Sequence, residues 1–128
     1  MTSVVLCFLI AIPVVFSTGA GKVMEGGGRC RKNNIVISQE STQPLPNGIP
    51  TFRVEITNQC VTGCSISDIH LNCGWFSSAT LIRPNVFKRL SYNDCLVNGG
   101  QPLEFGHTVS FQYATSFLFP LSVSSVQC

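Results

Sequence analysis

Charged residues are scarce in this sequence of 128 residues. Asp, Glu, Lys and Arg make up 11% of it and the net charge is +2, whereas an ordinary globular domain has about 25% charged residues. Binding to nucleic acid at physiological salt depends on many phosphate contacts from Lys and Arg. A balance this mild does not supply them, so nucleic acid is not expected as a partner.

Catalytic and cofactor motifs are also missing. The sequence holds no Gly-x-Ser-x-Gly, no His-Glu-x-x-His and no phosphate-binding loop. A histidine-activated nucleophile would have to use His70 or His107 with Asp68 or Asp94, and nothing in the sequence singles out one combination. We therefore expect neither enzyme activity nor a cofactor.

Helical periodicity is absent from every stretch of ten or more residues, and alternation of apolar and polar residues takes its place. Such alternation is typical of strands with one buried face. The predicted strands are residues 34–39, 52–57, 68–73, 108–113 and 121–126, the first and the last being the weaker patterns. Asn47-Gly48 suits a tight turn between two of them. The sequence predicts a compact all-β domain, an antiparallel β-sandwich or barrel.

A targeting segment is present at the start of the chain. Residues 4–16 form an apolar run, and residues 17–20 are small like those at a signal-peptidase site, although no Lys or Arg precedes the run. The run is shorter than the roughly 20 residues that span a bilayer core, which disfavours a membrane anchor. We expect a signal peptide at residues 1–20, a flexible lead-in at 21–29 and a cysteine-rich β domain at 30–128. The product should be secreted, without insertion into a membrane.

The sequence contains seven cysteines, and the expected cleavage removes Cys7. Six then remain: Cys30, Cys60, Cys64, Cys73, Cys95 and Cys128. An even number of cysteines in a small secreted domain predicts three disulfides. The sequence does not rank the possible pairings.

A metal site is the main alternative for the cysteines. Cys60, Cys64 and Cys73 with His70 offer three thiolates and an imidazole, a set that zinc accepts. Such a site needs reduced thiols, and it would leave an odd set of three cysteines in an oxidising compartment. A redox role is disfavoured as well, because two residues rather than three separate the cysteines of a thioredoxin motif. Disulfides therefore remain the favoured interpretation, and no metal is expected.

Basic residues gather in two short runs, Arg29-Cys30-Arg31-Lys32 and Lys88-Arg89. Runs of this kind are common on solvated surfaces. They could also form a patch that faces a partner, or dibasic sites of proteolytic processing. The sequence leaves these three possibilities open.

Longer motifs resemble a known family. They are "GIPTFRVEITNQC", "DIHLNCGWFSS", "NDCLVNGG" and "SFQYA", and the similarity runs from about Cys30 to Cys128 with all six cysteines in order. These motifs are similar to those of the plant tapetum determinant family of small secreted cysteine-rich proteins. The resemblance implies an apoplastic ligand for the ectodomain of a leucine-rich-repeat receptor kinase, with a role in anther cell fate and tapetum differentiation.

A receptor ligand needs anchor residues on its surface, and aromatic and arginine side chains dominate the energy of most interfaces. The candidates are Arg83, Lys88 and Arg89, followed by Trp75 and Phe76. Trp75 has an equally good alternative, which is to pack in the core against a disulfide.

A second hypothesis is a wall-associated carbohydrate-binding or structural module without a signalling role. Sugar binding by such a module would require an exposed, coplanar set of aromatic rings. The phenylalanines and tyrosines lie mainly on the apolar side of the predicted strands, which favours their burial. An inhibitory or antimicrobial role is disfavoured by the weak net charge.

Overall fold

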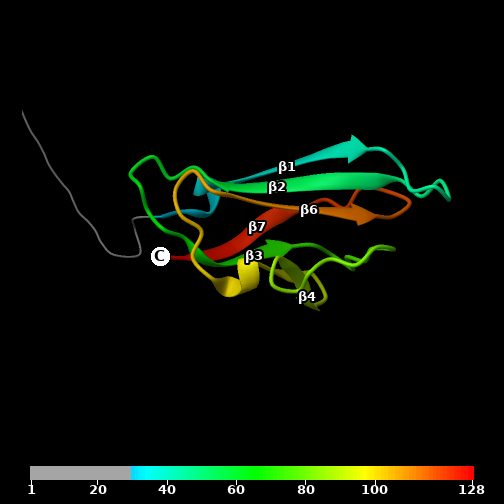
Figure 1. Ribbon diagram of the computed structural model, residues 1–128. Coiled ribbons are helices and arrows are strands. Elements are labelled where there is room, and N and C mark those ends of the chain that lie inside the picture. The colour runs from blue at the N-terminus through cyan, green and yellow to red at the C-terminus, as the bar shows by residue number, and fades with distance from the viewer. Residues whose placement is uncertain (1–29) are drawn as a thin grey trace, which may run out of the picture.

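The computed structural model describes residues 30–128, which form two antiparallel sheets stacked as two layers (Figure 1). The expected signal peptide and lead-in, with Cys7 and Arg29, lie outside the described residues. One sheet has the order β1-β2-β6, and the other has the order β4-β5-β3-β7. The predicted all-β fold with three disulfides is confirmed, and it is a sandwich rather than a closed barrel.

Seven strands build the two sheets. The three-stranded sheet contains β1 (Ile35–Thr42), β2 (Thr51–Asn58) and β6 (Thr108–Ala114). The four-stranded sheet contains β3 (Ser67–Asn72), β4 (Phe87–Ser91), β5 (Asp94–Val97) and β7 (Ser122–Gln127). Short 3-10 turns occur at Lys32–Asn34 and Asn98–Gly100.

The strands predicted from alternation are all present. Along β2, Val54 and Ile56 are buried, while Arg53, Glu55 and Thr57, which alternate with them, are partly exposed. The register places Val54 opposite Phe111 of β6 and Ile56 opposite Val109, so these side chains lie side by side on the same face of the sheet. The weaker patterns also form strands, β1 and β7.

The hairpin of β4 and β5 was not predicted. Only Phe87 is buried among the five residues of β4, so the strand has no alternating face for a sequence pattern to reveal. β4 is held as the edge strand of its sheet by antiparallel pairing with β5, where Phe87 lies opposite Val97. The basic pair Lys88-Arg89 therefore lies on an exposed edge strand.

Aromatic rings fill the space between the sheets. Phe76 lies in the middle of them, with its ring centroid 4.9 Å from that of Phe87, 5.0 Å from that of Tyr113 and 5.2 Å from that of Phe119. The Tyr113 hydroxyl donates to Oε1 of Gln39 (2.6 Å) and accepts from the backbone N–H of Phe119 (3.0 Å). Because buried hydroxyls need partners, these bonds hold the segment before β7 against the core.

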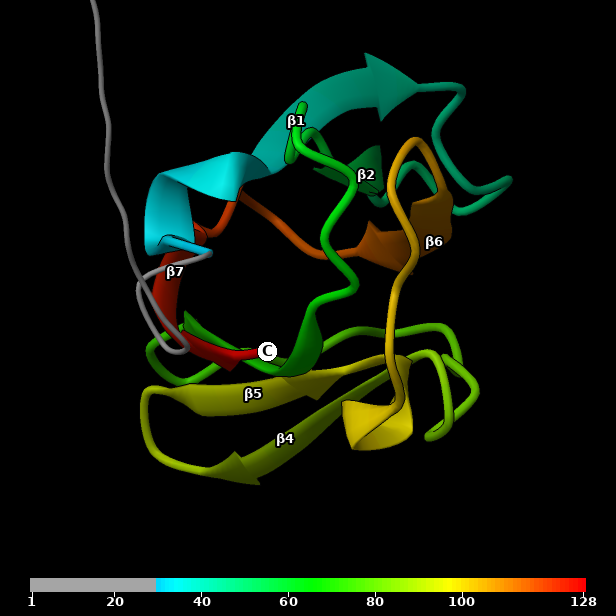
Figure 2. The ribbon, with the colours of Figure 1, turned by 90° about the vertical axis from the view of Figure 1, so that its left-hand side faces the viewer.

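One end of the sandwich is closed by cross-links, and we call it the closed end. The disulfide Cys60–Cys64 follows β2 there, and Cys30–Cys128 joins the start of the described chain to its last residue. Figure 2 looks onto this end, where the connection after β2 and the connection before β6 pass across the opening between the sheets. An isolated bridge between Ile66 and Leu103 joins those two connections.

Asn58 organises the closed end. Its side chain is completely buried, and its Nδ2 donates to the carbonyls of Cys64 (2.7 Å) and Leu103 (2.8 Å). Its Oδ1 accepts from the N–H of Cys60 (2.8 Å). Three bonds to one buried amide offset the cost of removing it from water, and they fix the disulfide loop to the neighbouring connection.

Candidate interaction surface

The opposite end of the sandwich, which we call the Trp75 end, carries most of the predicted partner residues. The chain turns there at Gly74, with φ of +56°, and at Asn93, with φ of +59°. The Gly74 N–H donates to Oδ1 of Asn93 (2.9 Å), and the Asn93 N–H donates to the Gly74 carbonyl (2.8 Å). The disulfide Cys73–Cys95 starts from the residue before Gly74 and ends two residues after Asn93, so the disulfide and these bonds hold the two turns together.

An exposed aromatic pair sits on these turns. Trp75 is 66% exposed and Tyr92 is 57% exposed, with ring centroids 4.7 Å apart. The guanidinium carbon of Arg89 lies 5.4 Å from the centroid of the Trp75 ring, within the range of a cation–π contact. The three side chains therefore form one cluster, although they come from the turn after β3, the turn after β4 and β4 itself.

Cations extend this cluster along the edge of the four-stranded sheet. Arg83, Lys88 and Arg89 are exposed, and we call them the basic strip. The ion pairs of the described chain are Arg53 with Glu55 (3.1 Å) and His70 with Asp94 (2.7 Å), so neither involves the basic strip. Within residues 30–128, none of these three cations is thus paired with a carboxylate, and all three are exposed to solvent or to a partner.

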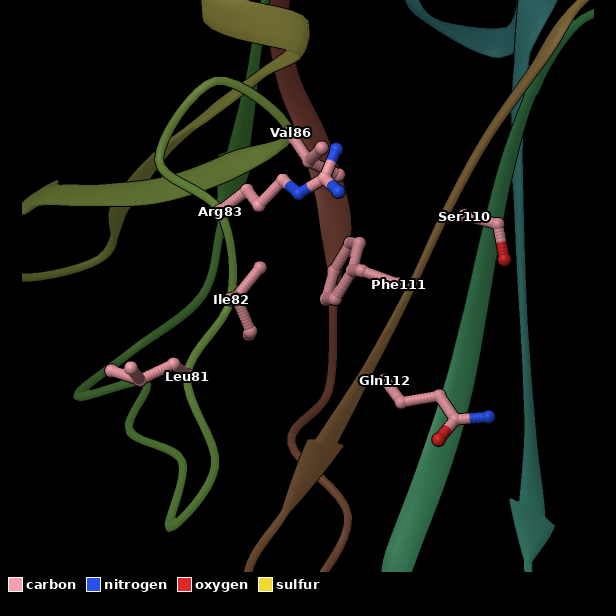
Figure 3. A pocket seen from close by; sticks show the side chains of 7 residues that line it. All are labelled: Leu81, Ile82, Arg83, Val86, Ser110, Phe111 and Gln112. Atoms are coloured by element: carbon pink, nitrogen blue, oxygen red, sulfur yellow. The ribbon is translucent and has the colours of Figure 1, made fainter.

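Two hollows flank the loop that joins β3 to β4. One, of about 240 Å³, lies between this loop and β6. Figure 3 shows Arg83 and Ile82 on the loop side, with the ring of Phe111 pointing toward them from β6. The other, of about 310 Å³, is lined by Lys88 and Arg89. Leu81 borders both hollows and is fully exposed.

The structure corrects two expectations about aromatic residues. Phe76 was placed on the partner surface, but only 6% of it is exposed because it is the centre of the aromatic core. The core alternative for its neighbour Trp75 is also wrong, since that ring lies at the surface. The turn at Gly74 reverses the chain just before these two residues, and Trp75 is directed outward while Phe76 points inward.

Comparison with known families now decides the relationship of the chain. The family model described as "Tapetum determinant 1, C-terminal" matches residues 31–128. This chain belongs to the tapetum determinant family. The family prediction made from the motifs is thereby confirmed, and the matched range covers every strand of the sandwich.

Named plant relatives agree with this assignment. "TPD1 protein homolog 1" of Arabidopsis thaliana is 59% identical over 102 residues, which are 80% of this chain and 57% of that protein. "TPD1 protein homolog 1B" of Oryza sativa subsp. japonica is 48% identical, over 77% of this chain and 58% of that protein. The chain thus spans about half the length of the curated relatives that it matches. No solved structure matches it.

The cysteines of this tapetum determinant domain are used in pairs. Cys60 bonds to Cys64, Cys73 to Cys95 and Cys30 to Cys128. The four residues considered for zinc are therefore split between two disulfides and a histidine that contacts Asp94. Among residues 30–128 no group of three or more His, Cys, Asp or Glu side chains is placed to hold a metal ion.

The one histidine–carboxylate pair found within residues 30–128 lies partly exposed on the four-stranded sheet. Nδ1 of His70 is 2.7 Å from Oδ1 of Asp94, and both side chains are about one third exposed. Ser125 is the cross-strand neighbour of His70, but the hydrogen bonds found in the described chain do not join them. This dyad lines neither of the two hollows described above.

Two residues important to this domain were not predicted from the sequence. Tyr92 pairs with Trp75, yet it lies in a hairpin that no pattern revealed. Asn58 was detectable, because it continues the inward phase of Phe52, Val54 and Ile56 by one more step. A polar residue on a buried phase indicates a satisfied buried group.

The part of the chain that the structure describes holds no helix long and apolar enough to cross a membrane.

Proposed function

We propose that this tapetum determinant protein is a secreted ligand whose Trp75 end binds the ectodomain of a leucine-rich-repeat receptor kinase. Membership of the family and a small fold rich in disulfides fit a secreted signalling protein. The receptor, the extracellular location and a role in anther cell differentiation come from the family resemblance and form part of the proposal.

The observation that carries the proposal is the composition of the Trp75 end. Interface hot spots are enriched in Trp, Tyr and Arg, and the cluster of Trp75, Tyr92 and Arg89 contains one of each. The basic strip beside it has no ion pair within the described chain. An acidic partner surface would complement these charges, and the exposed Leu81 supplies an apolar anchor.

Locked turns strengthen this interpretation. The disulfide Cys73–Cys95 and the bonds between Gly74 and Asn93 fix the two turns before any partner arrives. A surface held in its bound shape loses less conformational entropy on association. The Trp75 end therefore has the rigidity that a small ligand needs for a receptor.

The test is direct binding to purified ectodomains. The oxidised domain is titrated against a panel of leucine-rich-repeat receptor-kinase ectodomains, and the proposal expects saturable binding to at least one. The double variant Arg83→Glu/Lys88→Glu should slow association at least tenfold and weaken its dependence on salt, since exposed charges steer encounter. It leaves the contact of Arg89 with Trp75 intact.

Lys32→Glu is the matched control. Lys32 is an exposed cation beside β7, at the opposite edge of the four-stranded sheet from β4. The Lys32→Glu variant should bind the receptor ectodomain as the unmodified protein does. Absence of binding across the panel, or an equal loss in the control, would refute the proposal.

The carbohydrate-module hypothesis required a flat aromatic platform. The rings of Trp75 and Tyr92 are inclined by 50°, so this exposed pair does not form a platform of coplanar rings for a polysaccharide chain. Among the two functions, the receptor ligand has the better support.

A further inference from the structure

A third hollow, separate from the two that flank the loop between β3 and β4, is bordered by Trp75. It measures about 320 Å³ and is bordered by Asn72, Trp75, Asn93, Pro120 and Ser122. We call it the Trp75 cleft. Ligand sites begin at roughly 300 Å³, so this cleft suits a ligand of small size. Its walls come from the ends of β3 and β7 and from the turn between β4 and β5.

The polar side chains of the cleft form a chain of hydrogen bonds. Nδ2 of Asn93 donates to Oδ1 of Asn72 (3.3 Å), and Nδ2 of Asn72 donates to Oγ of Ser122 (3.1 Å). Each amide nitrogen has two hydrogens, each amide oxygen has two lone pairs, and the hydroxyl donates as well as accepts. Every member of the chain therefore keeps donor or acceptor capacity for a ligand.

The chemistry of the lining selects a class of ligand. None of the residues that line the cleft is charged, so the site offers nothing to balance an anion. An aliphatic ligand would bury the amides and the hydroxyl without partners, which costs free energy. A sugar ring has both an apolar face for the indole of Trp75 and hydroxyls that donate and accept. These two properties match the two kinds of surface in the cleft.

The cleft is fixed before a ligand enters. Asn93 is bonded to Gly74 in both directions. The backbone of Phe119, next to Pro120, donates to the Tyr113 hydroxyl (3.0 Å), and its carbonyl accepts from Nε2 of Gln39 (2.8 Å). The turn that carries Asn93 is therefore fixed to the turn at Gly74, and the segment that carries Pro120 is fixed to the core, which lowers the entropy lost on binding.

We infer that the Trp75 cleft binds a single neutral pyranose residue of a glycan, with Trp75 against the ring and Asn72, Asn93 and Ser122 on its hydroxyls. The same chemistry occurs in neutral wall polysaccharides and in the N-glycans of glycoproteins, so the test includes both. The inference does not depend on the receptor, because sugar binding can be measured on the isolated protein.

Trp75 is the single tryptophan of the chain, so tryptophan fluorescence reports on the surroundings of this one ring, which borders the cleft. The oxidised protein is titrated with xyloglucan oligosaccharides in one arm and with the free pentasaccharide core of N-glycans in the other. A saturable blue shift in either arm, with a Kd of roughly 1 mM or below, supports the inference and identifies the source. No shift in either arm up to ten times that concentration overturns it.

Two variants test the geometry by chemical-shift perturbation in nuclear magnetic resonance spectra, which does not need the indole. Trp75→Ala should weaken binding at least tenfold, and Ser122→Ala several-fold. Phe105→Ala is the matched control, an exposed aromatic residue at the closed end, and should bind normally. Unchanged binding by Trp75→Ala, or stronger binding of an acidic oligogalacturonide than of the neutral sugars, would contradict the assignment to this cleft.

Discussion

The two ends of the sandwich use similar materials for opposite purposes. Each has a disulfide beside an asparagine that bonds to neighbouring backbone, Asn58 with Cys60–Cys64 at one end and Asn93 with Cys73–Cys95 at the other. At the closed end the asparagine is buried and all its bonds go inward. At the Trp75 end the asparagine is exposed and keeps bonding capacity for a ligand.

This difference indicates a division of work within a small domain. The closed end brings the two termini of the described chain together and satisfies its polar groups internally. At the Trp75 end, a disulfide and hydrogen bonds of the same kind hold two exposed aromatic rings and a cation in place. Changes at the closed end should therefore act on stability, and changes to exposed residues at the Trp75 end should act on binding.

The largest loss of stability should follow removal of Cys30–Cys128, which closes the longest loop of the chain, with a sequence separation of 98. The chain-entropy model gives about 4.7 kcal/mol for such a loop and about 2 kcal/mol for one as short as that of Cys60–Cys64. We expect the Cys30→Ser/Cys128→Ser variant to unfold at much lower denaturant concentration than Cys60→Ser/Cys64→Ser. The reverse order would show that the short loop, and not the joined termini, dominates the closed end.

Phe76→Ala should come next, at about 4 kcal/mol, because it leaves a cavity among Phe87, Tyr113 and Phe119. Phe76 is adjacent in sequence to Trp75 but belongs to the buried core. Equilibrium unfolding in denaturant measures the loss. A cost below about 1 kcal/mol would mean that Phe76 is not in the core.

Asn58→Ala should cost about 3 kcal/mol, since two carbonyls and one N–H lose their buried partner. Asn85→Ala, a change of the same kind at an exposed position, should cost less than about 0.5 kcal/mol. The unfolding free energies of the two variants give the comparison. Equal costs would remove the distinction between the closed end and the surface.

Tyr113→Phe should cost about 1 to 2 kcal/mol, because the buried N–H of Phe119 loses its acceptor and Gln39 loses a donor. Burial raises the pKa of Tyr113, and the hydrogen bond from Phe119 lowers it by less. Above a pH of about 10 the unfolded chain therefore ionises at this residue before the folded chain does. The stability contributed by Tyr113 is complete below that pH and falls as pH rises above it.

Unfolding in denaturant between pH 8 and 11 checks this sign. The unmodified protein should lose more stability with rising pH than the Tyr113→Phe variant does. Parallel pH profiles for the two proteins would be inconsistent with a buried, hydrogen-bonded hydroxyl.

The smallest effect on stability is expected for Trp75→Ala, at about 1 kcal/mol or less, from an exposed aromatic pair and an exposed cation–π contact. The same variant should bind the sugar at least tenfold more weakly. Thermal unfolding measured beside the sugar titration separates the two effects. A loss of stability as large as that of Phe76→Ala would instead show that Trp75 is part of the buried core.

The strands of the inner core were predictable because their alternation is strong. β2 and β6 are neighbours in one sheet with Val54 opposite Phe111, and the buried face that they share leaves a clear period of two in the sequence. β4 left none, because an edge strand with one buried residue has no second face to alternate with. The basic run Lys88-Arg89 was visible in the sequence, but its position on an edge strand required the structure.

The disulfide pairing and the orientation of Trp75 depend on three-dimensional register. Cys73 meets Cys95 because β3 pairs with β5, and the number of residues between the two cysteines does not fix that pairing. Trp75 and Phe76 are adjacent aromatic residues after a turn, where no period indicates which of them points inward. Choosing between them required the turn geometry at Gly74.

Hydrogen exchange of the domain bound to a receptor ectodomain tests the division between the two ends most directly. Backbone amides of residues 74–92 should gain protection in the complex, while those of residues 58–66 and 103–107 should exchange as they do in the free protein. Protection confined to the closed end, with residues 74–92 unchanged, would contradict the account.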